Sequence, residues 1–278
     1  MILKNVTGNL LAYKQLEPGT FLHVDQLTTE RRTNHRLRNQ SFYTADGEMY
    51  AVEGTKHLWV ITREPQNLVL QNIDEAYRQL TDQRNYFPDT KLARDSVAHS
   101  DSVVVNLEGL KLVKNDDQYG YFVVDPRNVK RLNSEQRKAA QRIYGPDKEN
   151  FGLNLEMFAE AEKTLFVFVL MPEYVQGTLK SNDKRIFGRA SWLGDFYHDS
   201  YFNAFVRGVD YPGALHGVCR ENVARSTAVP ESRASRAPQE TEKVRSLTME
   251  EILTTSLPHT LKLRWKRLKA EIGKLYKQ

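Results

Sequence analysis

The sequence predicts a mixed α+β fold with small sheets and flanking helices, followed by a linker and a C-terminal helical tail. Three observations predict it. Stretches of alternating polar and apolar residues recur along the first two thirds of the chain, as in half-buried strands. Stretches with apolar residues at helical spacing lie between them. A Ser-, Ala- and Pro-rich flexible linker, residues 223–245, then precedes a basic helical segment, residues 246–278.

The first 66 residues form the β-rich N-terminal part of the predicted domain. Three stretches in it are expected as strands: LLAYKQL (10–16), GEMYAVEG (47–54) and HLWVITREP (57–65). An arginine-rich stretch with Arg31, Arg32, Arg36 and Arg38 lies between the first two. It is interpreted as an exposed loop or helix face, and a phosphate-facing patch is the alternative.

Residues 67–222 mix helices and strands, and we expect them to hold the main body of the domain. Apolar spacing predicts helices in LQNIDEAYRQLTDQ (70–83), NSEQRKAAQRIYG (133–145), NLEMFAEAEK (154–163) and PEYVQGTLK (172–180). Strands are expected in DSVVVNLEGLKLV (101–113), QYGYFVVDP (118–126) and TLFVFVLMP (164–172). Asn133 or Ser134 caps the second helix, Gly145 ends it, and Pro172 starts the last.

Length and composition bound the class of protein. The chain has 278 residues, 40% of them hydrophobic and 27% charged, as in globular proteins with a sizeable core. No apolar run approaches the roughly 20 residues that span a bilayer, and residues 1–19 lack a secretory layout. We therefore expect no membrane span and a cytoplasmic or virion-associated protein. The single cysteine, Cys219, excludes an intrachain disulfide and a multi-cysteine metal site.

Motifs of catalysis are absent from the sequence. It contains no Gly-rich phosphate loop, GxGxxG, HExxH or GxSxG, and its histidines show no metal-ligand spacing. Cys219 with His198 or His216 makes a poor nucleophile site because no partner spacing supports it. We predict a non-catalytic protein with no catalytic residue, metal or cofactor.

One stretch, Gly194–Cys219, differs from the rest of the chain and is called the variable segment below. It reads GDFYHDSYFNAFVRGVDYPGALHGVC. Lys, Glu, Gln, Met and Trp make up about a fifth of the whole sequence, yet the variable segment contains none of them. All five are encoded by codons that end in a purine. Changing only the adenines of an Asn codon, AAC or AAT, cannot produce them.

Short motifs before and within the variable segment follow a known layout: FGRASW (187–192), NAFVRG (203–208) and ALHGVCR (214–220). They resemble the end of a C-type-lectin-like domain of the formylglycine-generating-enzyme type. In that family an RGGSW-like strand, an Ala-x-Arg-like segment and a closing GFR-like strand follow one another. The matching residues are Arg189, Ser191, Trp192, Ala204, Arg207, Gly217 and Val218.

Composition and motifs together resemble the variable (target) proteins of diversity-generating retroelements. In that family a reverse transcriptase copies a template with adenine errors and writes it into the receptor gene. The resemblance implies a C-type-lectin-like fold over residues 67–222, a variable region at about 189–220 and a hypervariable ligand-binding site. The candidate contacts are Asp195, Phe196, Tyr197, His198, Asp199, Tyr201, Asn203, Phe205, Asp210, Tyr211 and His216.

A site that accepts many substitutions needs a fixed scaffold. We expect Arg189, Ser191, Trp192, Arg207 and Gly217 to supply it, with the two arginines buried and charge-paired. The apolar core beneath the site is expected from Trp192, Leu193, Val206, Leu215 and Val218.

The expected partner is a protein or another surface ligand that varies with the site. An alternative function is nucleic-acid binding, or binding of an acidic partner, through the basic C-terminal helix and the Arg-rich segment 30–38. An enzyme on the same fold would need a metal or a cysteine pair, and the chain does not have these residues.

Overall fold

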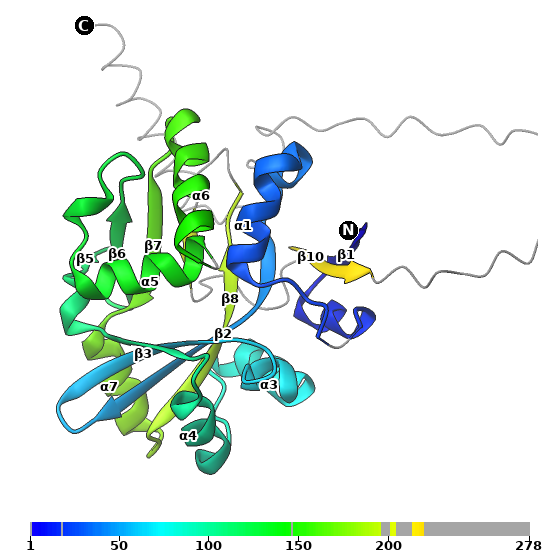
Figure 1. The fold of residues 1–278 in the computed structure, drawn as a ribbon. Coiled ribbons are helices and arrows are strands. Elements are labelled where there is room, and N and C mark those ends of the chain that lie inside the picture. Colours follow the sequence, from blue (N-terminus) through cyan, green and yellow to red (C-terminus); the bar gives the residue numbers. More distant parts are fainter. Residues whose placement is uncertain (1, 18, 146, 196–200, 204–212, 220–278) are drawn as a thin grey trace, which may run out of the picture. The chain divides into compact units, whose positions relative to one another are not determined.

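The computed structural model describes residues 2–17, 19–145, 147–195, 201–203 and 213–219 (Figure 1). The chain divides into two units, residues 1–224 and 225–278. All described residues belong to the first unit. The predicted linker and helical tail lie outside the described residues.

The described strands form one mixed sheet with the order β1-β10-β2-β8-β9-β7-β6-β5, and β3 and β4 branch from β2. The mixed α+β prediction is therefore confirmed, and the first 66 residues share their sheet with the later ones. The strands are β1 (Ile2–Gly8), β2 (Phe42–Glu53), β3 (Lys56–Thr62), β4 (Val103–Asn106), β5 (Val113–Lys114), β6 (Tyr119–Val124), β7 (Leu165–Leu170), β8 (Ile186–Leu193), β9 (Tyr201–Asn203) and β10 (Gly213–Cys219).

The centre of the sheet is covered on both faces. All eight residues of β8 are buried, and β8 pairs antiparallel with β2. Alternate side chains of a strand point to opposite faces, so β8 serves two separate cores. Phe187 and Leu193 belong to the first core, whereas Ala190 and Trp192 belong to the second.

Helices cover the two faces in two groups. Figure 1 shows α1, α5 and α6 grouped together, and they pack on the first core. The second core lies under η1, α2, α3 and α4. The helices are α1 (Val24–Thr33), α2 (Leu68–Gln71), α3 (Ile73–Gln83), α4 (Thr90–Ala98), α5 (Ser134–Tyr144), α6 (Lys148–Glu160) and α7 (Pro172–Ser181), with 3₁₀ helices η1 (Leu10–Gln15), η2 (His35–Asn39), η3 (Glu108–Leu110) and η4 (Val129–Arg131).

Helix-end signals in the sequence act as expected. The Asn133 side chain accepts a hydrogen bond from the Gln136 amide at 3.0 Å, and the Gln136 side chain accepts one from the Asn133 amide, which makes a capping box. Gly145 is the C-cap of α5, and Pro172 begins α7. The helices expected near residues 70–83, 133–145, 154–163 and 172–180 are all present.

The expected strand at LLAYKQL is wrong. This stretch forms the 3₁₀ helix η1, because the Asn9 side chain accepts a hydrogen bond from the Leu11 amide at 3.0 Å and turns the chain. Leu10 and Ala12 are then buried in the second core.

The strand expected over residues 101–113 is interrupted. It stops at Asn106, whose side chain accepts a hydrogen bond from the Glu108 amide at 3.2 Å and starts η3. Helix α4 was not expected from the sequence. Its N-cap, Asp89, accepts from the amides of Lys91 and Leu92 at 2.9 and 3.1 Å.

Candidate ligand-binding site at the variable segment

The start of the variable segment is held by a buried arginine. β8 ends at Leu193, and the carbonyl of Gly194 accepts a hydrogen bond of 2.7 Å from Arg31 Nη2. Arg31 also donates to the carbonyls of Leu37 and Gln40, at 3.2 and 2.8 Å. It therefore ties the segment's first residue to the end of α1 and to η2.

Burial of Arg31 corrects its expected exposure. The side chain is 0% exposed, and its guanidinium lies 5.1 Å from the centre of the Phe42 ring. Burial lowers the pKa of Arg31 to about 9, and the nearby Asp195 carboxylate acts in the opposite direction. The group thus stays charged at neutral pH and does not belong to a solvent-facing patch.

The other arginines of this stretch also have partners. Arg32 donates to the Asn150 side chain at 2.7 Å, and Arg38 donates to the carbonyl of Arg31 at 2.8 Å. Arg36 is exposed. Arg31, Arg32 and Arg38 therefore mainly connect parts of the fold, a role that the charge pattern of the sequence did not indicate.

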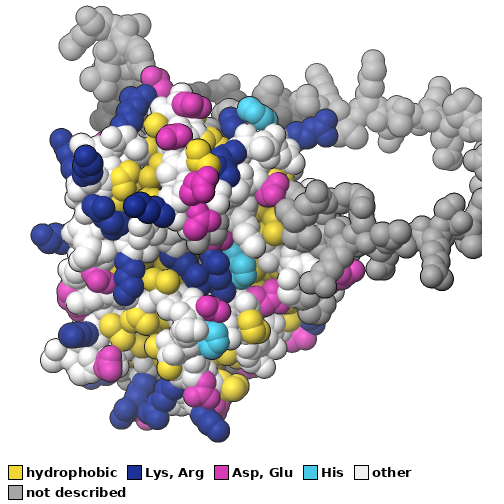
Figure 2. All heavy atoms as spheres, viewed as in Figure 1, with side chains coloured by type: hydrophobic (Ala, Val, Ile, Leu, Met, Phe, Trp, Pro, Cys, Tyr) yellow, Lys and Arg dark blue, Asp and Glu magenta, His cyan; other side chains and the backbone are white. Residues whose placement is uncertain are grey.

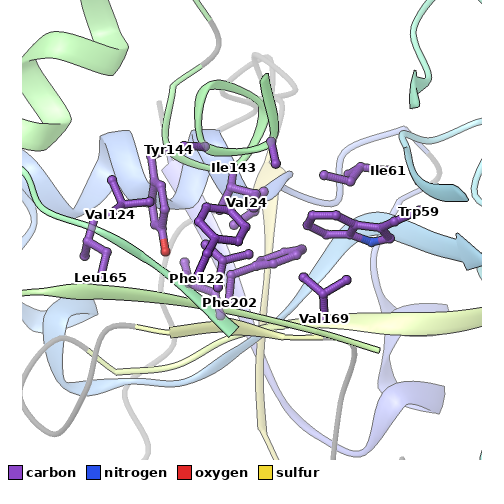
Figure 3. Close-up of a cluster of buried hydrophobic side chains, with 14 of the residues drawn as sticks. Val24, Trp59, Ile61, Phe122, Val124, Ile143, Tyr144, Leu165, Val169 and Phe202 are labelled. Atoms are coloured by element: carbon purple, nitrogen blue, oxygen red, sulfur yellow. The ribbon is translucent and has the colours of Figure 1, made fainter. Parts of the chain in front are cut away.

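The middle of the variable segment forms the short strand β9, which contributes Phe202 to the first core. β9 runs between β7, to which it is parallel, and β8, to which it is antiparallel. Phe202 at its centre is 0% exposed and lies in register with buried Val167. Figure 3 shows Phe202 among Trp59, Phe122 and Val169, and its ring centre is 6.3 Å from that of Trp59. The segment therefore contributes to the first core as well as to a surface.

The end of the variable segment is packed tightly. A Cβ on Gly213 would lie 2.7 Å from two ring atoms of Trp192, so the backbone here touches the indole. The Ala214 amide donates to the Ser41 carbonyl at 3.1 Å. β10 then pairs antiparallel with β1 over its full length, from Gly213 opposite Gly8 to Cys219 opposite Ile2.

A buried polar network supports the frame around Arg189. Its guanidinium donates to the Asn85 side chain at 2.9 Å and to the phenol oxygens of Tyr119 and Tyr174. It lies over both phenol rings, with 5.6 and 5.7 Å to their centres. Arg189 is therefore buried, as predicted, and the donors of these bonds meet neutral oxygens, while the charge pairing expected for Arg189 stays a prediction.

Glu48 lies opposite Arg189 in the β2–β8 register. Its carboxylate accepts hydrogen bonds of 2.9 Å from both the Tyr50 hydroxyl and the Trp59 indole. Burial raises the pKa of Glu48 to about 8, although these hydrogen bonds and Arg189 act against the rise. The network thus places a titratable carboxyl in the middle of the sheet.

The predicted scaffold residues are buried wherever the structure describes them. Arg189 and Ser191 are each 1% exposed, Trp192 is 4% exposed, and Gly217 is buried as well. Trp192 meets Tyr43 edge to face at 4.7 Å. Arg207 and Val206 lie outside the described residues, and Val218 is described by its backbone position alone; the burial of Leu193 and Leu215 is confirmed.

The predicted contacts are placed in part. Asp195 is half-buried directly after the Gly194 anchor. Tyr201 and Asn203 occupy β9 opposite Phe166 and Phe168, and His216 occupies β10 opposite Asn5. The others lie outside the described residues: Phe196, Tyr197, His198, Asp199, Phe205, Asp210 and Tyr211.

An aromatic cluster beside β9 was not identified from the sequence. Tyr121 of β6 contacts Phe166 and Phe168 of β7, with ring centres 5.7 and 5.5 Å apart, and all three rings are half-buried. Because Phe166 and Phe168 stand opposite Tyr201 and Asn203, this cluster borders two predicted contacts. The alternation of aromatic residues in YGYFVV and LFVFVL is the signal that indicates it.

The described part of the chain shows no sign of two other kinds of site. No group of three His, Cys, Asp or Glu side chains there is arranged to hold a metal ion. None of its helices combines the length and apolarity needed to cross a membrane.

Comparison with known proteins gives no relative: no family model, curated protein or solved structure matches the chain.

Proposed function

We propose that this chain is a non-catalytic binding protein whose variable segment displays a hypervariable ligand-binding surface, diversified by retroelement-directed adenine mutagenesis. The observation that carries the proposal is the complete absence of Lys, Glu, Gln, Met and Trp from Gly194–Cys219. These are the types that adenine-directed change of Asn codons cannot write. A purely structural preference for aromatic and small polar residues gives no reason to avoid all five.

Anchoring of the segment supports the proposal. Arg31 holds its first residue, Phe202 fixes its middle in the core, and β10 fixes its end against β1. The stretches between these anchors, residues 195–200 and 204–212, can then change with little cost to the core. Stability and recognition are thereby assigned to different residues, as an antibody-like site requires.

The proposed fold is C-type-lectin-like, of the formylglycine-generating-enzyme type. Its support is that strands stand where the resemblance needs them: β8 carries Arg189, Ser191 and Trp192, and β10 carries Gly217. We place the protein in the cytoplasm or on a virus particle assembled there.

The proposed ligand is a protein or another surface ligand. Tyr and Phe provide large contact area with few rotatable bonds, while Asp, Asn, Ser and Gly provide adaptable hydrogen bonds. The constant Tyr121–Phe166–Phe168 cluster adds an apolar border next to β9. Nucleic-acid binding through the basic C-terminal helix and residues 30–38 is the weaker alternative, because within 30–38 Arg31, Arg32 and Arg38 already have partners.

A display experiment tests the proposal. The codons of the eleven predicted contacts are randomised with a pyrimidine in the third position, and the library is selected against two unrelated proteins. We expect most members to remain folded and each target to enrich its own set of sequences. A matched library randomises buried frame positions instead, including Arg31, Trp192 and Phe202, and should lose folding in most members.

Equal loss of folding in the two libraries would contradict the proposal. The DNA around the gene gives a second test. It should contain a nearly identical repeat with adenines at the diversified codons, together with a reverse-transcriptase gene. A complete genome that contains neither would also contradict it.

A further inference from the structure

A basic pocket separate from the variable segment lies between the sheet and two helices. It has a volume of about 350 Å³ and is lined by residues that follow β3, begin β4, and form the end of α5 and the start of α6. Its cationic lining residues are Arg63, Lys138, Arg142 and Lys148. On the face that Figure 2 draws, Lys and Arg side chains gather near the middle, beside a histidine.

The sequence of α5 and its C-cap create the wall of the pocket. Lys138 and Arg142 are four residues apart and so lie on one face of α5. A Cβ on Gly145 would lie 2.3 Å from the Cα and 2.4 Å from the backbone nitrogen of Phe151. Only glycine permits this approach of α6 to the end of α5, and it brings Lys148 into the same pocket as Arg142.

Two buried carboxylates lie next to Arg63. Asp25 and Asp46 are both 0% exposed. Arg63 pairs with Asp25, and its Nε lies 3.9 Å from Asp46. His23 Nδ1 is 3.5 Å from Asp46, which also accepts a hydrogen bond of 2.6 Å from the Val24 amide. Arg63 is thus engaged with the two acids and is not the cation that a ligand would engage first.

The remaining cations of the pocket form no close ion pair in the described part of the chain, although the carboxylates of Asp46 and Asp25 act electrostatically on Arg142. Within the described residues, Lys138, Arg142 and Lys148 form no ion pair; Lys138 donates to the Val104 carbonyl and Arg142 to the Asp101 carbonyl. Arg142 Nε is buried without a hydrogen-bond acceptor in the same part of the chain. An unpaired buried donor on a charged group is costly, and because Arg142 lines the pocket, its guanidinium has hydrogen-bonding capacity left for an anion there.

Asp147, the one acid among the described lining residues, already accepts hydrogen bonds from a neighbouring residue. Both carboxylate oxygens of Asp147 accept from Asn150, one from its amide and one from its side chain, each at 2.8 Å, in the N-cap of α6. Burial lowers the pKa of Arg142, and the carboxylates of Asp46 and Asp25 offset only part of that effect. The described lining residues carry four cations against one carboxylate, and the buried Asp25 and Asp46 offset two of those charges, so positive charge remains in excess at the pocket.

We infer that this pocket is a binding site for a small phosphate-class oxyanion, held by Arg142, Lys138 and Lys148. Arginine suits tetrahedral oxyanions because its planar N–H donors reach two oxygens at once, and lysine adds point charge. The volume falls within the range of small-ligand pockets and exceeds that of one phosphate, so the pocket also has room for the small organic part of a phosphorylated compound.

Calorimetric titration of the full chain tests the inference. Inorganic phosphate, a nucleoside monophosphate and citrate are each titrated at low salt. We expect saturable binding of phosphate and of the monophosphate, with the dissociation constant raised at least about tenfold in Arg142→Gln. Lys148→Gln should also weaken binding. Because Lys148 is exposed, this change should leave the protein folded, so weaker binding would reflect the lost charge. Tighter binding of the monophosphate than of phosphate would identify the organic phosphate as the ligand.

Lys114→Gln is the matched control, because Lys114 is an exposed lysine paired with Asp117 and does not line the pocket. It should leave phosphate binding unchanged. The inference is overturned if phosphate does not saturate, if Lys148→Gln and Lys114→Gln behave alike, or if citrate binds while both phosphates do not.

Discussion

Replacing Phe202 with alanine tests whether the variable segment contains a fixed core position. The side chain is 0% exposed and packs in the first core near Trp59. Truncating a fully buried phenylalanine costs about 3–5 kcal/mol, because transfer free energy is lost and a cavity remains. Since domains are stable by about 5–15 kcal/mol, Phe202→Ala should remove about a fifth or more of the free energy of unfolding.

Phe166→Ala is the control for this prediction. Phe166 stands next to β9 in the β7 register but is only half-buried. Removing its side chain should cost about 1–2 kcal/mol, because less apolar surface is buried there. Urea unfolding followed by tryptophan fluorescence and circular dichroism measures both. If Phe202→Ala costs no more than Phe166→Ala, the assignment of Phe202 to the core is refuted.

Three further predictions concern the frame. Glu48→Gln should flatten the pH dependence of the free energy of unfolding. In the wild type the folded protein keeps a proton on Glu48 up to about pH 8, whereas the unfolded chain loses it near pH 4.5, so stability falls by up to about 1.4 kcal/mol per pH unit between these values. Urea unfolding from pH 5 to 8 measures this dependence, and the same dependence in variant and wild type would contradict the prediction. Arg31→Met should lower the free energy of unfolding by about 3–5 kcal/mol, because three carbonyls lose their hydrogen-bond donor. Arg36→Met, at an exposed position, should lower it by under about 0.5 kcal/mol. Thermal unfolding compares the two variants, and similar melting temperatures would count against Arg31 as the anchor of Gly194. Gly213→Ala should destabilise the protein by about 1–3 kcal/mol, because its Cβ would press against the Trp192 ring, and it should alter the near-ultraviolet circular dichroism. Gly177→Ala in α7, where the Cβ would meet open space, should stabilise the protein by about 0.5–1 kcal/mol. The reverse order of stabilities would exclude close packing at the end of the variable segment.

Much of the fold was predictable because its signals are local. The α5 capping box, Pro172 at the start of α7 and the apolar run of β7 each depend on residues close in sequence. The composition of Gly194–Cys219 is also a local signal, which is why a candidate site could be located without a structure.

What the sequence did not indicate depends on distant contacts. Arg31 looks like part of a solvated basic run, but its partner Gly194 lies 163 residues away. Phe202 has polar and aromatic neighbours in sequence, and only the pairing of β9 with β7 shows that it faces the core. Leu10 and Ala12 alternate like strand residues, yet the Asn9 cap turns them into a 3₁₀ helix against the second core.

The three-residue strand β9 bears on how much sequence variety the proposed binding site can hold. β9 is paired on both sides midway along the segment, so the proposed contacts outside β9 and β10 fall into two stretches, residues 195–200 and 204–212. A substitution in one stretch then leaves the ends of the other in place. Under the proposed function, the repertoires of the two stretches therefore multiply, and a useful sequence in one can be kept while the other is exchanged.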